Sequence, residues 1–364
     1  MGLNRDGNPG GQHMPGTEIT ADLTVLTEGT RGPLTQSYLD WKNIKSNRPQ
    51  IYALGVKELW RTKKQPEKVI HTLGHPLPKD CFGGSWMYPM GDDLVSFGLV
   101  AGLDYKDHNL DVHVLLQKLK KHPLFAEYLD GGELVEWGAK TIPEGGLEAV
   151  PERLYGDGVL FAGDCVGMVN VPALKGIHYA MHSGILAART AYKALKAKSY
   201  NEDTLKDYDQ AVRSSYIFSD LKKVRNMRHA FKSGFYSGGL KAGLMTLTGG
   251  AFPGVSSHQE EDAAEAKTTG KPSVENQGIS KVDAVYLSGN KTRDDIPQHL
   301  TVGKDISKEM AEHYAHLCPA GVYEVQDDKL VVNAPNCIDC KATDVLGPRW
   351  QPREGGSGPN YKQM

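Results

Sequence analysis

Three cysteines near the C-terminus have spacings typical of metal ligands. Cys337 and Cys340 form a C-x-x-C pair in "APNCIDCKATD", and Cys318 precedes a proline in "HLCPAGVYEV". A Cys-Pro dipeptide also closes the cluster motifs of bacterial ferredoxins, in which four thiolates hold the iron–sulfur cluster. The next position of a C-x-x-C-x-x-C run is occupied by Thr343, whose hydroxyl is a hard, weakly acidic donor. The pattern therefore indicates a metal site with three thiolates and leaves its fourth ligand open.

Several outcomes are compatible with this donor set. Three thiolates can hold a [3Fe-4S] cluster, or a [4Fe-4S] cluster with one labile iron. Zinc held by the three cysteines and either His313 or His316 is a Cys3His alternative, and an empty site is a further one. The remaining cysteines, Cys81 and Cys165, stand alone in the sequence and are predicted to be buried structural thiols.

A second candidate site combines the end of a strand with the start of a helix. Residues 159–162 are predicted to form a buried strand that runs into Gly163-Asp164, and a helix with one small and apolar face is predicted from Ile177. A carboxylate there can accept a bond from a ribose or ribityl hydroxyl, and a helix N-terminus offers free N–H groups to an anionic ligand. Taken alone, the Gly-Asp pair fits an ordinary strand–turn–helix better. The G-x-G-x-x-G fingerprint of a dinucleotide-binding βαβ unit does not occur in the sequence.

Composition and charge narrow the classes of function. The 364 residues carry a formal net charge of -2, so no global field attracts nucleic acid, and we expect no nucleic-acid partner. Five cysteines at these spacings do not suggest the disulfide framework of a secreted domain. The sequence contains no run of 18 apolar residues, so it predicts no transmembrane helix. We expect no signal segment in the first twenty residues, which resemble the interior of a domain.

The middle of the chain predicts an antiparallel sheet and one amphipathic helix. Residues 50–105 alternate short apolar runs with Gly and Pro punctuation, which is typical of antiparallel strands. The pair Gly83-Gly84 lies in one of these strands beside aromatic residues and indicates either a close backbone approach or a β-bulge. Residues 110–129 are predicted to form a helix that stops near Pro123.

Residues 233–253 form a glycine-rich apolar segment with a single charge, Lys241. A basic run precedes it, made of Lys222, Lys223, Arg225, Arg228 and Lys232. A basic segment beside an apolar one can lie in the plane of an anionic membrane surface, although a buried helix is an equal alternative. Residues 256–282 are charged and poor in apolar residues, so a flexible linker is expected there.

Eight separate segments occur in the order found in electron transfer flavoprotein–ubiquinone oxidoreductases. They read "GVKELW", "FGGSWMY", "GLVAGLDY", "GAKTIPEGG", "NVPALKGIHYAMHSGILAA", "LKKVRNMR", "CPAGVYEV" and "PREGGSGPNYKQM". The chain resembles this family from about residue 2 to residue 364, but it corresponds only to the later part of the family's chain. The family's N-terminal stretch, with its FAD pyrophosphate loop, has no counterpart here. We therefore expect the 364 residues to bind FAD poorly.

The resemblance implies an electron-transferring-flavoprotein dehydrogenase, in which electrons pass from reduced electron transfer flavoprotein through a [4Fe-4S] cluster and FAD to ubiquinone. It implies FAD contacts at Gly163, Asp164, Gly176 and Ile177, and Lys175 at the same helix entrance is a further expected FAD contact. It implies a quinone contact at Gly83 and Gly84, and cluster ligands at Cys318, Cys337 and Cys340. In this resemblance Thr343 occupies the slot of the fourth ligand, so a [3Fe-4S] cluster or an empty site remains an alternative.

The implied fold class is α+β, with three parts. A partial FAD-binding domain of the two-dinucleotide-binding-domain type covers residues 1–40 and 151–255, and an antiparallel-sheet quinone-binding domain covers 41–150. A linker at 256–282 precedes a ferredoxin-like cluster domain at 283–364. We expect a peripheral membrane monomer on the cytoplasmic face of a bacterial inner membrane or the matrix side of a mitochondrial one. The alternatives are an inactive fragment or binding remnant, and a related flavoprotein reductase that does not use quinone.

Overall fold

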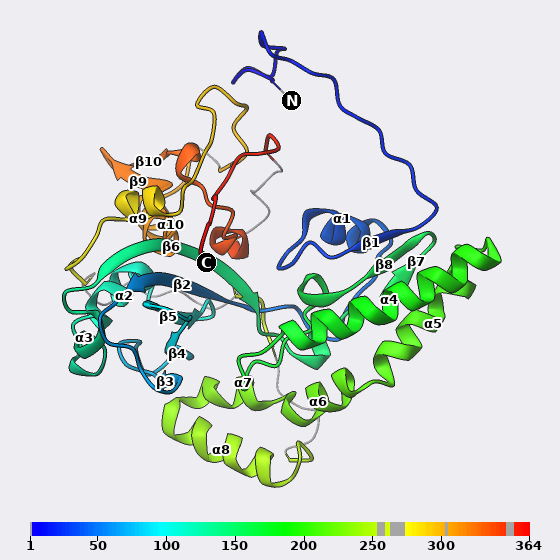
Figure 1. Cartoon of the computed structure of the whole chain (residues 1–364), viewed down its shortest axis with the longest axis horizontal. Coiled ribbons are helices and arrows are strands. Elements are labelled where there is room, and N and C mark those ends of the chain that lie inside the picture. Colours follow the sequence, from blue (N-terminus) through cyan, green and yellow to red (C-terminus); the bar gives the residue numbers. More distant parts are fainter. Residues whose placement is uncertain (1, 253–258, 263–273, 303–304, 347–352) are drawn as a thin grey trace. The chain divides into compact units, whose positions relative to one another are not determined.

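The chain folds as two compact units, each built from separate stretches of sequence. The computed structural model describes residues 2–252, 259–262, 274–302, 305–346 and 353–364. Unit 1 comprises Met1–Gly16, Ala53–Thr141 and Asp262–Met364, and unit 2 comprises Thr17–Tyr52 and Ile142–Glu261. Figure 1 colours both along the sequence. Much of the predicted linker at 256–282 lies outside the described residues.

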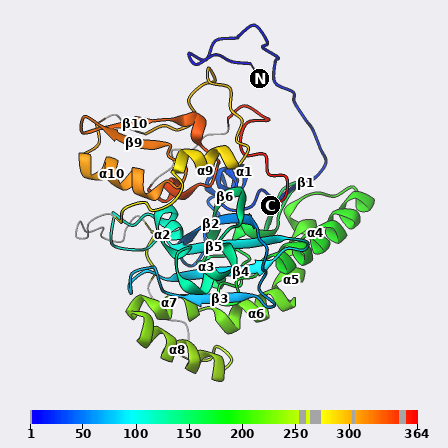
Figure 2. The ribbon, with the colours of Figure 1, turned by 60° about the vertical axis from the view of Figure 1, so that its left-hand side comes forward.

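A five-stranded sheet of order β3-β4-β5-β2-β6 forms the centre of unit 1 (Figure 2). Its strands are β2 (Tyr52–Arg61), β3 (Ile70–Leu73), β4 (Gly83–Pro89), β5 (Leu94–Gly102) and β6 (Glu133–Pro143). The pairs β2–β5, β3–β4 and β4–β5 are antiparallel. The structure thus confirms the antiparallel sheet that the alternating apolar pattern predicts.

Two helices stand where the sequence predicts one that stops near Pro123. α2 (Val112–Leu119) is capped by Asp111, whose side chain accepts a bond from the Val114 N–H, and α3 begins at Pro123 and runs to Leu129. Proline is well suited to the first turn of a helix because its missing N–H would lack an intrahelical partner there. The proline therefore starts a second helix instead of ending the first.

The C-terminal part of unit 1 is a small helix–hairpin assembly. Its elements are α9 (Lys281–Leu287), α10 (Lys308–Leu317), β9 (Tyr323–Gln326), β10 (Lys329–Val332) and the 3-10 turns η4 (Ala334–Asn336) and η5 (Ala342–Leu346). Ser280 and Ser307 cap the two helices through their side chains. β9 and β10 pair as an antiparallel hairpin, and α10 lies along it (Figures 1 and 2).

Unit 2 contains a short three-stranded sheet and a set of helices. β1 (Thr24–Leu26) runs parallel to β8 (Val159–Phe161), which pairs antiparallel with β7 (Tyr155–Gly156). The first helices and 3-10 turns are α1 (Pro33–Trp41), η1 (Leu147–Ala149), η2 (Gly163–Val166), α4 (Ile177–Ala197) and α5 (Glu202–Arg213). Tyr208 of α5 lies in the core and donates its hydroxyl to the Phe161 carbonyl at 2.7 Å. This bond fixes α5 against the strand that leads to Gly163-Asp164.

The remaining elements of unit 2 are α6 (Tyr216–Val224), α7 (Met227–Ala230), η3 (Phe231–Ser233) and α8 (Phe235–Leu247). Arg228 of α7 is buried and pairs with buried Glu144 at 2.6 Å. Arg228 is therefore one half of an internal ion pair, and it adds nothing to the exposed positive charge expected from the basic run. None of the helices in the described ranges combines the length and apolar character needed to cross a membrane.

Candidate metal centre

Cys318, Cys337, Cys340 and Thr343 line one small cavity in unit 1. Cys318 follows the last residue of α10, Cys337 follows η4, and Thr343 lies within η5. The three cysteines are 4%, 8% and 8% exposed, and the threonine is 8% exposed. The structure therefore brings together the four positions that the cysteine spacing indicates.

Lys281 holds the end of α10, where Cys318 lies. Its ammonium donates to the carbonyls of Ala315 and Cys318, both at 2.7 Å, and pairs with Asp111 at 2.6 Å. A cation on the last carbonyls of a helix satisfies acceptors that have no intrahelical donor and stabilises the negative end of the helix dipole. Lys281 thereby fixes the backbone from which the Cys318 thiol projects.

The loop between Cys337 and Thr343 has an unusual backbone conformation. Asp339 and Lys341 adopt left-handed φ values of 56° and 64°, which cost about 1 kcal/mol or more in residues that carry a Cβ. The Thr141 N–H donates to the Cys340 carbonyl at 3.0 Å. This contact ties the loop to β6 and helps to hold the strained conformation.

Burial raises the pKa of all three thiols. The pKa of Cys318 is raised, that of Cys337 lies well above its ordinary value, and that of Cys340 rises to about 12. The neighbouring cysteines add to the effect, because charge on Cys318 disfavours charge on Cys340. Without a metal the three sulfurs are therefore protonated at neutral pH. Binding a metal must release these protons.

The donor set fits an iron–sulfur cluster at three positions and poorly at the fourth. Among the described residues, the sulfurs of Cys318, Cys337 and Cys340 do not all lie within 4.8 Å of one another. Ligands of a single zinc ion would be about 3.3–3.8 Å apart, whereas a cluster spreads its thiolates over several irons. Neither His313 nor His316 joins the cysteines in such a group in the described part of the chain. Thr343 offers only a hydroxyl where a thiolate is preferred.

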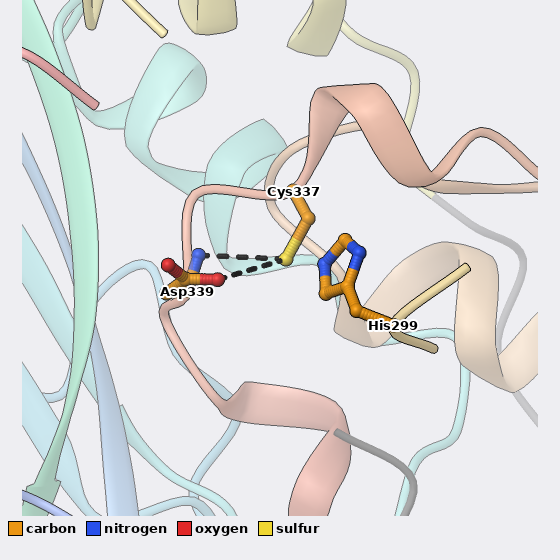
Figure 3. Close-up of side chains that lie close together, drawn as sticks. All are labelled: His299, Cys337 and Asp339. Atoms are coloured by element: carbon orange, nitrogen blue, oxygen red, sulfur yellow. Dashed lines mark hydrogen bonds between the residues drawn. The ribbon is translucent and has the colours of Figure 1, made fainter. Parts of the chain in front are cut away.

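Sequence reasoning missed His299 and Asp339, which lie beside Cys337 (Figure 3). His299 comes from the loop between α9 and α10, and burial lowers its pKa to about 4. The Asp339 N–H donates to the Cys337 sulfur at 3.4 Å, and Arg353 donates to the Asp339 carboxylate at 3.0 Å. The place of Asp339 inside the C-x-x-C pair is visible in the sequence, but no local pattern marks His299.

The residues predicted to lie along FAD are found in unit 2. Gly163 has a φ of 76°, and its N–H donates to the Ser183 hydroxyl of α4 at 3.1 Å. A Cβ on Gly176 would lie 3.3 Å from the Asp164 carboxylate, so these two residues are neighbours. Burial raises the pKa of Asp164. The strand end and the helix start therefore meet, as the sequence pattern indicates.

The start of α4 is open to solvent. Ile177 is 79% exposed, and no side chain caps the N-terminus of the helix. Lys175 is held by its backbone, which exchanges two hydrogen bonds with Asn170. Leu174 and Met181 are 54% and 65% exposed, so an apolar surface surrounds this end of the helix.

Packing within the sheet accounts for Gly83 and Gly84. A Cβ on Gly83 would come within 2.1 Å of the Val100 carbonyl, and one on Gly84 within 1.9 Å of the Thr72 carbonyl. The Gly83 carbonyl also accepts the Gly74 N–H at 3.0 Å. Both glycines are thus required by neighbouring strands, whatever else they contact.

Two family models match parts of the chain. "ETF-QO, ubiquinone-binding" matches residues 52–142, and "Electron transfer flavoprotein-ubiquinone oxidoreductase, 4Fe-4S" matches residues 277–362. The 4Fe-4S match contains the cysteines, Thr343 and His299. A geranylgeranyl bacteriochlorophyll reductase-like protein from Thermoplasma acidophilum has a similar structure with a TM-score of 0.49 and 15% identity, over 62% of this chain and 54% of that one.

Curated relatives match almost the whole chain. A probable mitochondrial electron transfer flavoprotein-ubiquinone oxidoreductase from Saccharomyces cerevisiae is 35% identical over 99% of this chain and 65% of its own length. The mitochondrial electron transfer flavoprotein-ubiquinone oxidoreductase of Oryza sativa is 34% identical over 100% of this chain and 68% of its own length. This chain thus spans about two thirds of the relatives it matches. From its segments, its cysteine site and these matches, the chain belongs to the electron transfer flavoprotein–ubiquinone oxidoreductase family.

Proposed function

We propose that this chain passes electrons from reduced electron transfer flavoprotein to ubiquinone, using an iron–sulfur cluster held by Cys318, Cys337 and Cys340. The observation that carries the proposal is the meeting of three buried thiols around one cavity within the segment matched by the 4Fe-4S model. When bound, a cluster and FAD supply the redox chemistry that protein side chains lack. The match to the ubiquinone-binding model favours this enzyme over a related reductase that does not use quinone.

The residues around the thiols prepare them for a cluster. Their burial excludes water, and the Asp339 N–H directed at the Cys337 sulfur stabilises negative charge there. Lys281 is close enough to Cys318 to lower the cost of its thiolate, although burial has the larger effect on that pKa. These groups place and hold the sulfurs, which is the protein's part in an electron-transfer site.

For FAD we propose contacts at Gly163, Asp164, Lys175, Gly176 and Ile177. Support comes from the left-handed turn at Gly163, the proximity of Asp164 to Gly176, and the uncapped start of α4. Glycine allows a ligand to approach the backbone closely, and free N–H groups at a helix start suit an electron-rich ligand. The carboxylate of Asp164 would accept a bond from a hydroxyl of the cofactor.

For ubiquinone we propose that backbone groups at Gly83 and Gly84 contact a quinone carbonyl. Both residues lie within the segment matched by the ubiquinone-binding model. Their packing in β4 explains why glycine is needed there, so the quinone contact rests on the family match and not on the presence of glycine.

We further propose that α8 lies on a membrane surface. Four apolar side chains spaced along one face of the helix are exposed: Tyr236 81%, Leu240 71%, Leu244 42% and Leu247 85%. Such a stripe suits the interface between lipid head groups and acyl chains, where the quinone is dissolved. We place the protein at the matrix face of a mitochondrial inner membrane or the cytoplasmic face of a bacterial one, as a monomer.

One observation favours a second candidate, an impaired or inactive remnant of this enzyme. Thr343 stands where a fourth thiolate would complete a [4Fe-4S] cluster. A site with three thiolates would hold a three-iron cluster, a four-iron cluster with one labile iron, or none. These outcomes differ in iron content and spectrum, so they are separable by experiment.

Anaerobic reconstitution of the parent, Thr343→Cys and Thr343→Ser proteins tests the proposal. The parent and Thr343→Ser should bind less iron, or give a [3Fe-4S] signal when oxidised, whereas Thr343→Cys should give the spectrum of a reduced [4Fe-4S] centre. The reason is that a fourth soft thiolate closes the coordination of the labile iron, while serine keeps the hard oxygen. The rate at which a ubiquinone analogue oxidises reduced electron transfer flavoprotein, assayed with added FAD, should be higher for Thr343→Cys than for the parent. If none of the three proteins binds iron and sulfide, the cluster proposal fails.

A further inference from the structure

We propose that the metal-free chain binds a single zinc ion through His299, Cys337 and Asp339, and that this ion competes with the cluster. One ligand atom from each of the three residues lies within 4.8 Å of the others. Figure 3 shows the imidazole of His299 beside the Cys337 sulfur, with Asp339 on the other side of that sulfur. The donor atoms are a sulfur, a nitrogen and an oxygen, which are the three kinds of ligand that zinc accepts.

The separations suit one ion better than several. Zinc forms bonds of about 2.0–2.3 Å, so its ligand atoms lie about 3.3–3.8 Å apart in a tetrahedral site. Closing a triangle with sides of at most 4.8 Å requires side-chain movements of about an ångström. The cysteine set, by contrast, does not form so compact a group in the described residues. The two donor sets share Cys337 but differ in the chemistry that their spacing favours.

His299 supplies an independent indication that a ligand belongs here. The residue is 3% exposed, and neither ring nitrogen has a hydrogen-bond partner among the described residues. A buried polar atom without a partner destabilises the folded chain, because it has lost its hydrogen bonds to water. Coordination of zinc by one nitrogen would remove that cost at one atom.

Local charges are compatible with a divalent cation. The Cys337 thiolate and the Asp339 carboxylate would bring two negative charges to the ion, and Arg353 binds the other carboxylate oxygen at 3.0 Å. The oxygen nearer the sulfur, at 3.6 Å, is then directed toward the site. Arg353 thus orients the carboxylate as an outer partner of a metal ligand does.

The shared cysteine makes the two metals mutually exclusive. The Cys337 sulfur cannot bind both the zinc ion and the iron of a cluster in the geometry of either site. A chain loaded with zinc should therefore resist cluster assembly, and a chain that holds a cluster should not take up zinc at His299. Zinc would act as a competitor that decides whether the protein acquires its redox group.

Four variants of the reduced, metal-free protein separate the two donor sets. Zinc affinity is measured by competition with a chromophoric chelator, and Co²⁺ is added in parallel because its absorption reports a bond to thiolate sulfur. His299→Ala should weaken zinc binding by about 100-fold or more, and Cys337→Ser should do the same. Cys318→Ser and Cys340→Ser should leave zinc affinity within about threefold of the parent while preventing cluster assembly. His299→Ala should still assemble as much cluster as the parent.

Three results would overturn the proposal. One is a parent protein that binds no zinc, and another is unchanged zinc affinity in His299→Ala. The third is loss of zinc in Cys318→Ser and Cys340→Ser alongside Cys337→Ser, which would place the ion among the three cysteines. His299→Asn, and the Co²⁺ spectra of Cys318→Ser and Cys340→Ser, keep the test decisive if His299→Ala fails to fold.

Discussion

The cysteine site of unit 1 and the 163–177 segment of unit 2 offer a ligand different atoms. The cysteine site presents side-chain donors that are at least nine-tenths buried. The 163–177 segment presents backbone groups and one carboxylate beside an exposed apolar surface that includes Ile177 and Met181. When the ligand of a buried donor set is absent, the folded protein is less stable, because the buried polar atoms lack partners. An exposed backbone site keeps its hydration and depends on apolar contact for affinity.

Removing one thiolate tests the cysteine site, and its effect on cluster assembly should be the largest of the expected effects. Cys340→Ala should abolish assembly of a stable cluster, because two thiolates and a hydroxyl are too few soft ligands to retain the irons. Cys81→Ala is the matched control, since Cys81 is also buried in unit 1 but does not line the cavity. Iron and sulfide analysis after reconstitution should show cluster in the control only. Equal loss in both variants would mean that the effect comes from folding.

Charging the apolar stripe of α8 tests the open surfaces of unit 2. Leu240→Asp with Leu244→Asp should weaken binding to anionic liposomes by about 100-fold or more, since each leucine contributes about 1.5–3 kcal/mol when buried. Thr246→Asp adds one negative charge at an exposed position about 160° around the helix from Leu244, and it is the matched control for Leu244→Asp alone. Co-sedimentation gives the measurement. Binding that is equal in all variants would show that α8 does not contact lipid.

Removing the Lys281 ammonium, which holds the backbone at Cys318, should lower the free energy of unfolding by a moderate amount. Lys281→Met keeps the apolar stem but removes the bonds to the Ala315 and Cys318 carbonyls and the ion pair with Asp111. We expect the free energy of unfolding of the metal-free chain to fall by about 2 kcal/mol. The control, Lys308→Met, breaks an exposed pair with Asp328 and should lower the free energy of unfolding far less, because solvent screens that pair. Urea denaturation measures both, and similar costs would show that Lys281 does not support the site.

The sequence allows good prediction where a pattern is local. The spacing of Cys337 and Cys340, the alternation over 50–105 and the strand before Gly163 each correspond to elements that the structure contains. These patterns reflect short-range geometry, such as the two-residue period of a strand. Local patterns fail at Pro123, where the structure has two helices and the sequence predicts one, because a proline can either end or begin a helix.

Contacts between distant residues could not be predicted in this way. His299 meets Cys337 only because the loop after α9 folds over the turn that follows β10, and no spacing encodes that approach. Arg228 likewise reads as one cation of a basic run, although its burial against Glu144 makes it an internal ion pair. In both cases tertiary packing decides which side chains meet. A one-dimensional pattern does not contain that information.

The smallest expected effect concerns Gly163 and distinguishes a strained turn from a turn that also faces a ligand. Gly163 and Gly29 have φ values of 76° and 74°, and both belong to unit 2. A Cβ on Gly29 would meet nothing within 4 Å, whereas one on Gly163 would lie 3.3 Å from the Ala180 Cβ. Gly29→Ala should therefore cost about 1 kcal/mol of unfolding free energy, which is the cost of a left-handed backbone alone.

Gly163→Ala should cost about 0.5–1 kcal/mol more than Gly29→Ala, because α4 must shift by a few tenths of an ångström. If Gly163 lies along FAD, its variant should also weaken whatever affinity the chain has for FAD, measured by fluorescence quenching, whereas Gly29→Ala should not. An equal effect of both variants on FAD would remove Gly163 from the cofactor site. If Gly163→Ala weakens FAD affinity beyond what its effect on stability explains, and Gly29→Ala does not, the 163–177 segment of unit 2 binds FAD through its backbone.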